Sequence, residues 1–259
     1  MTGWFHRQYS IPRVCLMRLF LMRLFLIILF FVSSASVSFA ETIILGAEND
    51  WVPYSNHDGT GMASEIVLAA YKAIGIDVKL QVGPYNRLLK MVRNGEILGA
   101  FNVPRERSNE KEYIFGKIPL FTALSAYYYN VEEPLSATQK EELVNGEKVG
   151  VVFDYGYGEF FSNNDRVTKI KVRSDLLNLR KLAKGRIDVT ILYDKTAQKL
   201  IKENGLTGKI LKAFDSETAE IYVAFSKVFP KAQYYADKLD EGLGIIKANG
   251  IYKRVMDAY

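Results

Sequence analysis

The chain has 259 residues, with 34 lysines and arginines against 29 acidic residues, and it contains one cysteine and two histidines. A single cysteine excludes a disulfide within the chain and a cysteine-based metal site. Two histidines supply little for histidine-based catalysis or metal binding.

Residues 1–40 are expected to be a secretory signal peptide. Four arginines, at positions 7, 13, 18 and 23, flank or precede the apolar run LFLIILFFV at 24–32, and Ser-Phe-Ala at 38–40 ends the segment. This pattern predicts cleavage after Ala40. A permanent membrane anchor is the rival reading, but the run falls short of the ~20 apolar residues that span a bilayer. Met17 and Met22 are alternative starts.

Removing this leader changes the charge argument. It holds four of the basic residues and none of the acidic ones, so residues 41–259 have a net charge of +1. The basicity of the whole chain therefore does not indicate nucleic-acid binding. Cys15 leaves with the leader. Secretion without disulfides favours the bacterial periplasm.

The first part of the remaining sequence alternates strand and helix patterns. Apolar or alternating runs predict strands at 42–47, 76–82 and 97–103, and helical spacing predicts helices at 62–74 and 85–93. The order strand, helix, strand, helix, strand implies right-handed crossovers and a mostly parallel sheet.

A second series follows. Strands are predicted at 124–131, 148–153, 167–172, 189–193 and 219–225, a polar turn with a short helix at 133–145, and helices at 175–184, up to 202, and at 233–259 with a break at Gly250. This series predicts a second lobe of the same kind. The last helices have no sheet of their own, so we expect them to return to the first lobe.

Between these series, the stretch 95–121 carries a charged loop with Arg105 and Arg107. An arginine-bearing loop at a strand end is suited to holding an anion in a cleft. A solvated surface loop is the alternative. The loop alone does not decide between them.

The order of the pieces resembles the bacterial extracellular solute-binding proteins of family 3, the amino-acid-type binding proteins of ABC importers. The matching pieces are DWVPY at 50–54, GMASE at 61–65, NG at 94–95, GAF at 99–101, FG at 115–116, Pro119, GRID at 185–188, AFSK at 224–227 and GIY at 250–252 with the terminal Tyr259.

The resemblance implies an α/β, two-lobed, type 2 periplasmic-binding-protein-like fold. Each lobe is a mainly parallel sheet flanked by helices, and two crossing strands join the lobes. The implied domains are the signal peptide at 1–40, lobe 1 at 41–124 plus 220–259, and lobe 2 at 125–219.

The resemblance also implies roles for particular residues. Trp51 and Tyr54 fall where the family packs aromatic rings against the ligand, although both could instead cover the sheet end. Glu65 occupies an acidic position at a helix start, which also suits the helix dipole. Tyr85 and Arg87 match a stretch that lines the cleft edge.

Two departures from the family pattern concern the ligand. The arginine that holds the ligand carboxylate corresponds to Asn109 here, so Arg105 or Arg107 would have to replace it. The aspartate that holds the ligand ammonium corresponds to Tyr193, with Asp194 beside it but pointing elsewhere on a regular strand. A standard α-amino acid is therefore disfavoured as the ligand, and a rearranged clamp stays open.

The loop at 154–158 falls where backbone N–H groups of the second lobe meet the ligand, or else it is a turn packed on its own lobe. The predicted ligand-binding residues are Asp50, Trp51, Tyr54, Glu65, Tyr85, Arg87, Asn102, Arg105, Arg107, Asp154, Tyr155, Tyr157, Tyr193 and Asp194.

The predicted function is capture of a small polar solute, an amino acid or a related compound, in a cleft between the lobes for ABC-type import. The alternatives are a ligand-sensing protein without a transporter and a dehydratase-like enzyme on the same fold. An enzyme would need a paired acid and base, for which Glu48, Asp50, Glu65 and Asp154 are candidates. We expect no cofactor, metal, catalytic residue or nucleic-acid partner, an inner-membrane ABC permease or sensor as partner, and a monomer.

Overall fold

The structure, a computed structural model, describes residues 41–259. The predicted signal peptide, with its cleavage point and alternative starts, lies outside the described residues. Within 41–259, no helix combines the length and the apolar character needed to cross a membrane.

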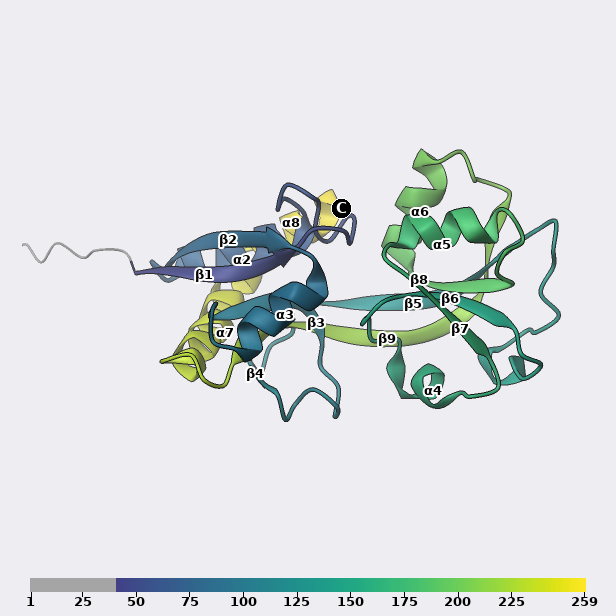
Figure 1. The fold of residues 1–259 in the computed structure, drawn as a ribbon. Helices are drawn as coiled ribbons and strands as arrows, with labels where there is room; N and C mark the ends of the chain where they lie inside the picture. The colour runs from purple at the N-terminus through teal and green to yellow at the C-terminus, as the bar shows by residue number, and fades with distance from the viewer. Residues whose placement is uncertain (1–40) are drawn as a thin grey trace, which may run out of the picture. The chain divides into compact units, whose positions relative to one another are not determined.

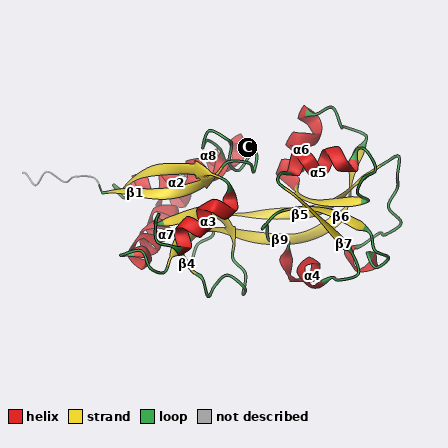
Figure 2. Ribbon diagram, in the orientation of Figure 1, coloured by secondary structure: helices red, strands yellow, loops and turns green. Residues whose placement is uncertain are grey.

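A nine-stranded sheet forms the framework of this part of the chain (Figures 1 and 2). Its strands are β1 (Thr42–Glu48), β2 (Asp77–Gly83), β3 (Gly99–Pro104), β4 (Tyr113–Phe115), β5 (Phe121–Asn130), β6 (Lys148–Val152), β7 (Thr168–Val172), β8 (Val189–Tyr193) and β9 (Ile210–Ser226). The order is β2-β1-β3-β9-β5-β8-β6-β7, with β4 paired to β9. In each lobe three strands are parallel, β2-β1-β3 in lobe 1 and β7-β6-β8 in lobe 2.

The long strands β5 and β9 join the two lobes. They pair antiparallel from Phe121 and Ile221 at one end to Asn130 and Ile210 at the other. Figure 1 shows them running side by side from one lobe into the other. The pairing register shifts between Leu124 and Ala126, so the two halves of this ladder are not one regular ribbon.

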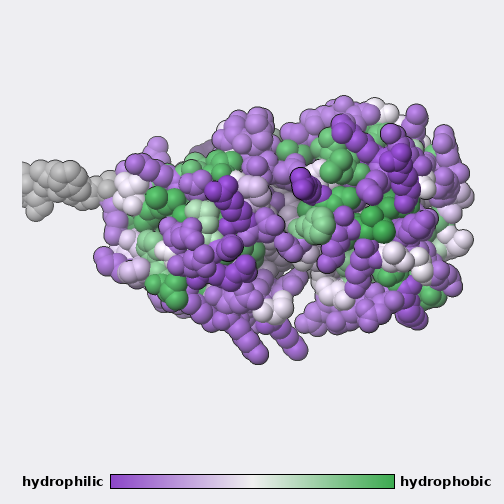
Figure 3. All heavy atoms as spheres, viewed as in Figure 1, coloured by the Kyte–Doolittle hydropathy of each residue, from purple (hydrophilic) through white to green (hydrophobic). Residues whose placement is uncertain are grey.

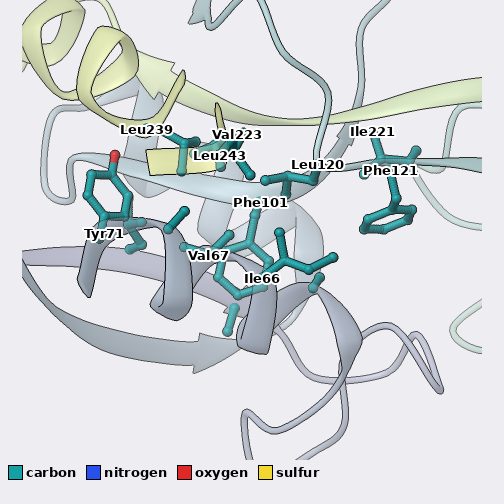
Figure 4. Packing of buried hydrophobic residues seen from close by; sticks show 14 of the residues in the cluster. Ile66, Val67, Tyr71, Phe101, Leu120, Phe121, Ile221, Val223, Leu239 and Leu243 are labelled. Atoms are coloured by element: carbon teal, nitrogen blue, oxygen red, sulfur yellow. The ribbon is translucent and has the colours of Figure 1, made fainter. Parts of the chain in front are cut away.

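The helices of lobe 1 cover both faces of its sheet. One face packs against α2 (Met62–Ala73), α7 (Ala232–Ala248) and α8 (Ile251–Ala258), and the other against α3 (Tyr85–Arg93). Figure 4 shows Val67 and Tyr71 of α2 and Leu239 and Leu243 of α7 in the first of these cores. Burial of such side chains stabilises the lobe by roughly 1.5–3 kcal/mol each.

Lobe 2 is built in the same way, with helices on both faces of its sheet. Its helices are α4 (Gly158–Asn163), α5 (Asp175–Leu182), α6 (Asp194–Glu203) and the 3₁₀ turn η1 (Lys140–Glu142). Tyr157 and Phe161 pack with Val149 and Ile191 on one face of the sheet. On the other face, Leu179 of α5 packs with Ala197 of α6.

The predicted two-lobed α/β fold is confirmed, including the return of the last helices to lobe 1. Three details differ. The last strand begins at Ile210 rather than 219, because pairing with β5 extends it across both lobes. The short strand β4 was not predicted, and the helix expected within 133–145 is only the single turn η1.

Candidate functional site

The carboxyl ends of the parallel strands of both lobes meet around one cavity. β1 ends at Glu48, β3 at Pro104 and β8 at Tyr193, and ligands of open α/β sheets bind at such ends. The cavity is small in this structure, with a volume of about 10 Å³. Its lining residues are Glu48, Trp51, Tyr85, Asn102, Pro104, Tyr155, Gly156 and Tyr193. We call it the aromatic cavity.

Four aromatic rings from the two lobes surround this cavity. Trp51 lies edge-on to Tyr193 of lobe 2, with ring centroids 4.8 Å apart, and Tyr85 lies edge-on to Tyr155 at 5.4 Å. A tight loop fixes Trp51, because its backbone N–H and C=O both bond to Ser55, at 3.1 and 2.9 Å. The cavity wall is therefore made jointly by the lobes and is largely apolar.

Asn102 reaches this wall through an irregularity in β3. The pairing of β3 with β9 shifts register between Ala100 and Val103, and Asn102 has a positive φ of 72°. Bulges of this kind redirect a side chain. The Asn102 side chain is 3 % exposed, and its Nδ2 donates to Ser55 Oγ at 2.9 Å. Its Oδ1 has no partner among the described residues.

Glu48 places a carboxyl group at the bottom of the cavity. The residue is 3 % exposed, and the Tyr155 hydroxyl from lobe 2 donates a hydrogen bond to Glu48 Oε1. Burial raises the pKa of Glu48 to about 8, with a smaller rise from the charges of Asp175 and Asp50. At neutral pH this carboxyl is therefore mostly protonated in the ligand-free cavity.

A second buried acid lies close to the cavity. Asp175 follows β7 at the start of α5, is 4 % exposed, and has an Oδ2 atom without a partner in the described part of the chain. Burial raises its pKa to about 8, and the charge of Asp50 adds to the rise. Asp175 also contributes to the raised pKa of Tyr155 and Tyr157, after burial as the main cause. The interior of the cleft is thus acidic.

Two larger hollows adjoin the aromatic cavity. The outer cleft has a volume of about 660 Å³, and its lining residues are Glu48, Asn49, Asp50, His57, Pro84, Tyr85, Asn86, Val152, Phe153, Asp154, Tyr155 and Arg173. The hinge cavity has a volume of about 350 Å³ and adjoins the crossing strands. Its lining residues are Pro104, Arg105, Glu106, Arg107, Ser125, Gly156, Tyr157, Gly158, Glu159, Tyr193 and residues 217–220. Figure 3 shows a hollow between the two lobes on a mostly hydrophilic face.

The structure brings ten of the predicted site residues to these three hollows. They are Asp50, Trp51, Tyr85, Asn102, Arg105, Arg107, Asp154, Tyr155, Tyr157 and Tyr193. Their convergence from segments far apart in the sequence was expected from the resemblance, and the strand ends explain it physically.

The other four predicted residues lie elsewhere. Tyr54 stacks on Phe121 behind Trp51, at 4.9 Å and 8° between the rings, and so supports the wall rather than lining it. Glu65 is exposed and accepts a hydrogen bond from the Tyr259 hydroxyl at 2.6 Å. Arg87 is exposed on α3 and lines none of the three hollows.

Asp194, the fourth, points away from the cleft. It accepts hydrogen bonds from the Tyr128 hydroxyl at 2.7 Å and from Lys212 Nζ at 3.0 Å. Its neighbour Tyr193 is buried at the cavity and donates to the Gly156 carbonyl at 3.3 Å. Tyr193 is the last residue of β8 and Asp194 the first of α6, so the two neighbours belong to different elements and point in different directions.

Asn109, which corresponds to the arginine that holds the ligand carboxylate in the family, makes hydrogen bonds within its own loop. Asn109 Nδ2 donates to the Pro104 carbonyl at 2.8 Å, and its Oδ1 accepts the backbone N–H of Glu106 at 3.0 Å. Arg105 pairs with exposed Glu110 at 2.7 Å and lies over the rings of Phe115 and Tyr222. Both Arg105 and Arg107 face the hinge cavity rather than the aromatic cavity.

The sequence reasoning missed parts of the site. Glu48 was considered only as an enzymatic acid or base, and Asp175 only as a helix start. Pro104, Gly156 and Arg173 were not considered. The position of Glu48 at the end of a central parallel strand is a signal that could have identified it. Nothing in the local sequence marks Asp175 as a buried acid.

Comparison with known proteins bears on the fold. No model of a protein family matches the sequence, and no curated protein sequence matches it. Among solved structures, a histidine kinase sensor domain with similarity to periplasmic binding proteins is 20 % identical, covering 85 % of this chain and 96 % of that one with a TM-score of 0.75.

Two amino-acid-binding proteins are similar to a comparable extent. An ancestral arginine-binding protein bound to arginine is 18 % identical, covering 84 % of this chain and 97 % of that one with a TM-score of 0.73. The arginine-, lysine-, histidine-binding protein ArtJ from Geobacillus stearothermophilus is 18 % identical, covering 85 % and 95 % with a TM-score of 0.69. At these identities the likeness establishes the two-lobed fold.

Proposed function

We propose that the protein captures a small polar solute in the aromatic cavity and closes its lobes around it, without chemistry. One observation carries this proposal: residues of both lobes line a single, largely apolar cavity at the strand ends. Small-molecule sites combine such apolar walls with a few placed polar groups. Here the polar groups are Glu48, Asn102 and the tyrosine hydroxyls.

The proposal places the protein in the bacterial periplasm as a monomer that delivers its solute to an inner-membrane ABC permease. Two comparisons support it, since the similar structures include arginine-binding proteins and ArtJ. The signal-peptide pattern of residues 1–40, cut after Ala40, supports export.

Ligand sensing is the second candidate. The similar histidine kinase sensor domain favours it, because that domain has the same fold and nearly full coverage. In that role a receptor, instead of a permease, would bind the closed form of the protein. Solute uptake by cells with and without the gene separates the two, because only import requires the protein for uptake.

The proposed lobes are 41–124 plus 220–259, and 125–219. The register shift between Leu124 and Ala126 supports this division, because a broken ladder is a natural place for bending. At the same point Ser125 Oγ donates to the Glu217 carbonyl at 2.9 Å and accepts its N–H at 3.3 Å. We propose these crossing-strand residues as the hinge.

A thermal unfolding screen of the purified protein tests the proposal. The compounds are α-amino acids, polyamines, organic acids and small peptides. A solute at about 100 times its Kd stabilises the native state by roughly 2.7 kcal/mol. For a chain of this size, that raises Tm by several degrees, at about 2–4 °C per kcal/mol.

The matched variant is Tyr155→Ala, which removes one wall of the aromatic cavity. We expect it to unfold cooperatively and to lose the rise in Tm. If no compound raises Tm, solute capture is rejected. An equal rise in wild type and variant would place binding outside the aromatic cavity.

A further inference from the structure

The aromatic cavity is lined and flanked by buried acidic groups. Among the described residues, those that line it include no lysine, arginine or histidine, whereas Glu48 lies inside it and Asp175 close by. Asp50 adds charge at the adjoining outer cleft. A buried carboxylate is costly unless it is paired, and so the site is set up to receive a positive group.

Buried polar atoms without hydrogen-bond partners also favour a positively charged ligand. Asn102 lines the cavity, is more than nine-tenths buried, and leaves the acceptor Oδ1 unsatisfied among the described residues. Trp51 Nε1 is a donor without a partner in the same part of the chain, at 2 % exposure. An ammonium group carries donors for Glu48 and Asn102. The single indole N–H of Trp51 can donate to a hydroxyl or carbonyl oxygen of a ligand. It does not suffice for a ligand carboxylate, because a buried carboxylate needs a charged donor or several donors.

The aromatic walls fit a cation as well. Ring faces of tryptophan and tyrosine attract organic cations, by roughly 0.5–2 kcal/mol each depending on desolvation. Trp51, Tyr85, Tyr155 and Tyr193 surround the cavity. The cavity volume in this structure is about 10 Å³, room for about one water, so an organic ion enters only as the two lobes part.

We propose that the ligand is a small organic ammonium ion that bears N–H donors and needs no α-carboxylate, with Glu48 as its counter-charge. This rests on the proposed function of the same cavity. The arginines that could hold a carboxylate line the adjoining hollows and not the aromatic cavity itself: Arg105 and Arg107 line the hinge cavity, and Arg173 lines the outer cleft.

Binding of such an ion releases a proton from the protein. Because burial holds Glu48 mostly protonated near pH 7, an entering ammonium ion shifts it to the carboxylate and releases a proton. The groups around Glu48 are Asp50, Tyr85, Tyr155, Tyr157, Asp175 and Tyr193, together with His57 and Arg173, which line the outer cleft with it. The raised pKa values of these tyrosines keep them neutral, whereas burial raises the pKa of Asp175 to about 8, so Asp175 can also exchange a proton near pH 7.

Titration calorimetry of the purified protein at pH 7.5 tests the ligand class with matched probes. Agmatine and arginine differ by the α-carboxylate. Putrescine, 4-aminobutanoate and succinate form a four-carbon series from two ammonium groups to two carboxylates. We expect agmatine or putrescine to bind tightest, each at least tenfold tighter than its carboxylate-bearing counterpart, and succinate not to bind.

The variant Glu48→Gln keeps the shape of the side chain and removes its charge. It should weaken amine binding at least tenfold. The control Glu96→Gln neutralises an exposed acid that precedes β3, at the opposite edge of the same sheet, and should leave affinity within twofold. If the Glu48→Gln variant does not fold, proton release by the wild type, measured in buffers of different ionisation enthalpy, replaces it.

The outcomes separate the two levels of the proposal. Tightest binding of arginine, 4-aminobutanoate or succinate, or an unchanged affinity in Glu48→Gln, overturns the ammonium assignment and leaves solute capture intact. Amine binding without proton release overturns the role of Glu48. Failure of all five probes rejects the ammonium assignment, and solute capture then falls only if the broad thermal screen is negative too.

Discussion

Glu48 supplies the buried carboxyl group that is central to the chemistry of the cleft. It stands at the end of a strand whose last four residues are buried, and Glu48 itself is 3 % exposed. The Tyr155 hydroxyl stabilises it from the opposite lobe. A buried carboxyl group with a raised pKa lowers the stability of the folded state, and such groups are common at functional sites.

The pH dependence of stability follows from this environment. The folded pKa of Glu48 is about 8 against an ordinary 4.5, so between these values the folded state holds a proton that the unfolded state has released. Its contribution to stability is complete below pH 4.5 and is lost as pH rises through 8. Over pH 5–8.5 this amounts to ~4 kcal/mol, at about 1.4 kcal/mol for each pH unit between the two pKa values. We therefore expect Tm of the ligand-free wild type, measured by calorimetry, to fall over this range by roughly 8–16 °C more than that of Glu48→Gln.

Asp175 has the same direction of shift and is present in both proteins, so the difference between the two curves isolates Glu48. Parallel curves for wild type and Glu48→Gln from pH 5 to 8.5 would show that Glu48 is ionised in the folded state. That result would also remove the expected proton release on binding.

Helix packing in lobe 1 depends on a close approach of α2 and α7. A Cβ added at Gly242 would lie 2.1 Å from the Ala70 carbonyl oxygen, whereas one added at Gly244 would meet nothing within 4 Å. The two glycines lie in the same helix, two residues apart. They therefore form a matched pair in which helix propensity is shared and the packing differs.

Gly242→Ala should destabilise the protein by about 1–3 kcal/mol, because the methyl group must push the helices apart. Gly244→Ala should stabilise it by up to about 1 kcal/mol, because alanine is the better helix former. Urea unfolding of both variants measures the two effects. Equal free energies of unfolding would mean that α2 and α7 do not approach as closely as the structure has them.

Most of the elements were predictable because their periodicity is clear. The apolar run of β1 and the helical spacing of α2 are local signals, and both elements appear within a residue or two of their expected limits. β4 has only three residues and exists because β9 offers an open edge. The first half of β9 mixes apolar and polar residues without regular alternation and is half exposed, so only its partner β5 defines it as a strand.

The site could be predicted in outline and not in its charges. Trp51, Tyr85 and Tyr155 follow from the order of segments, because strand ends of both lobes must meet at the cleft. The role of Asn109 depends on hydrogen bonds within its loop, and that of Asp194 on a hydrogen bond from the start of α6 to Tyr128 of β5. The first depends on the folded conformation of the loop, and the second joins residues far apart in the sequence. The spacing of residues in the sequence therefore does not predict them.

At the scale of the whole molecule, two lobes share two strands and one cavity. β5 and β9 carry the chain between the lobes, and Trp51 from lobe 1 contacts Tyr155 and Tyr193 from lobe 2. Any solute that occupies the cavity must therefore change the surroundings of Trp51. The full sequence contains one other tryptophan, Trp4, within the predicted leader.

The emission of Trp51 during titration with agmatine and putrescine tests the central claim, that this cavity between the lobes is the binding site. The account predicts a saturable change in tryptophan emission whose midpoint equals the calorimetric Kd, and its loss in Trp51→Phe while Tm still rises with the amine. Calorimetric binding with no change in Trp51 emission, or an undiminished change in Trp51→Phe, would contradict it.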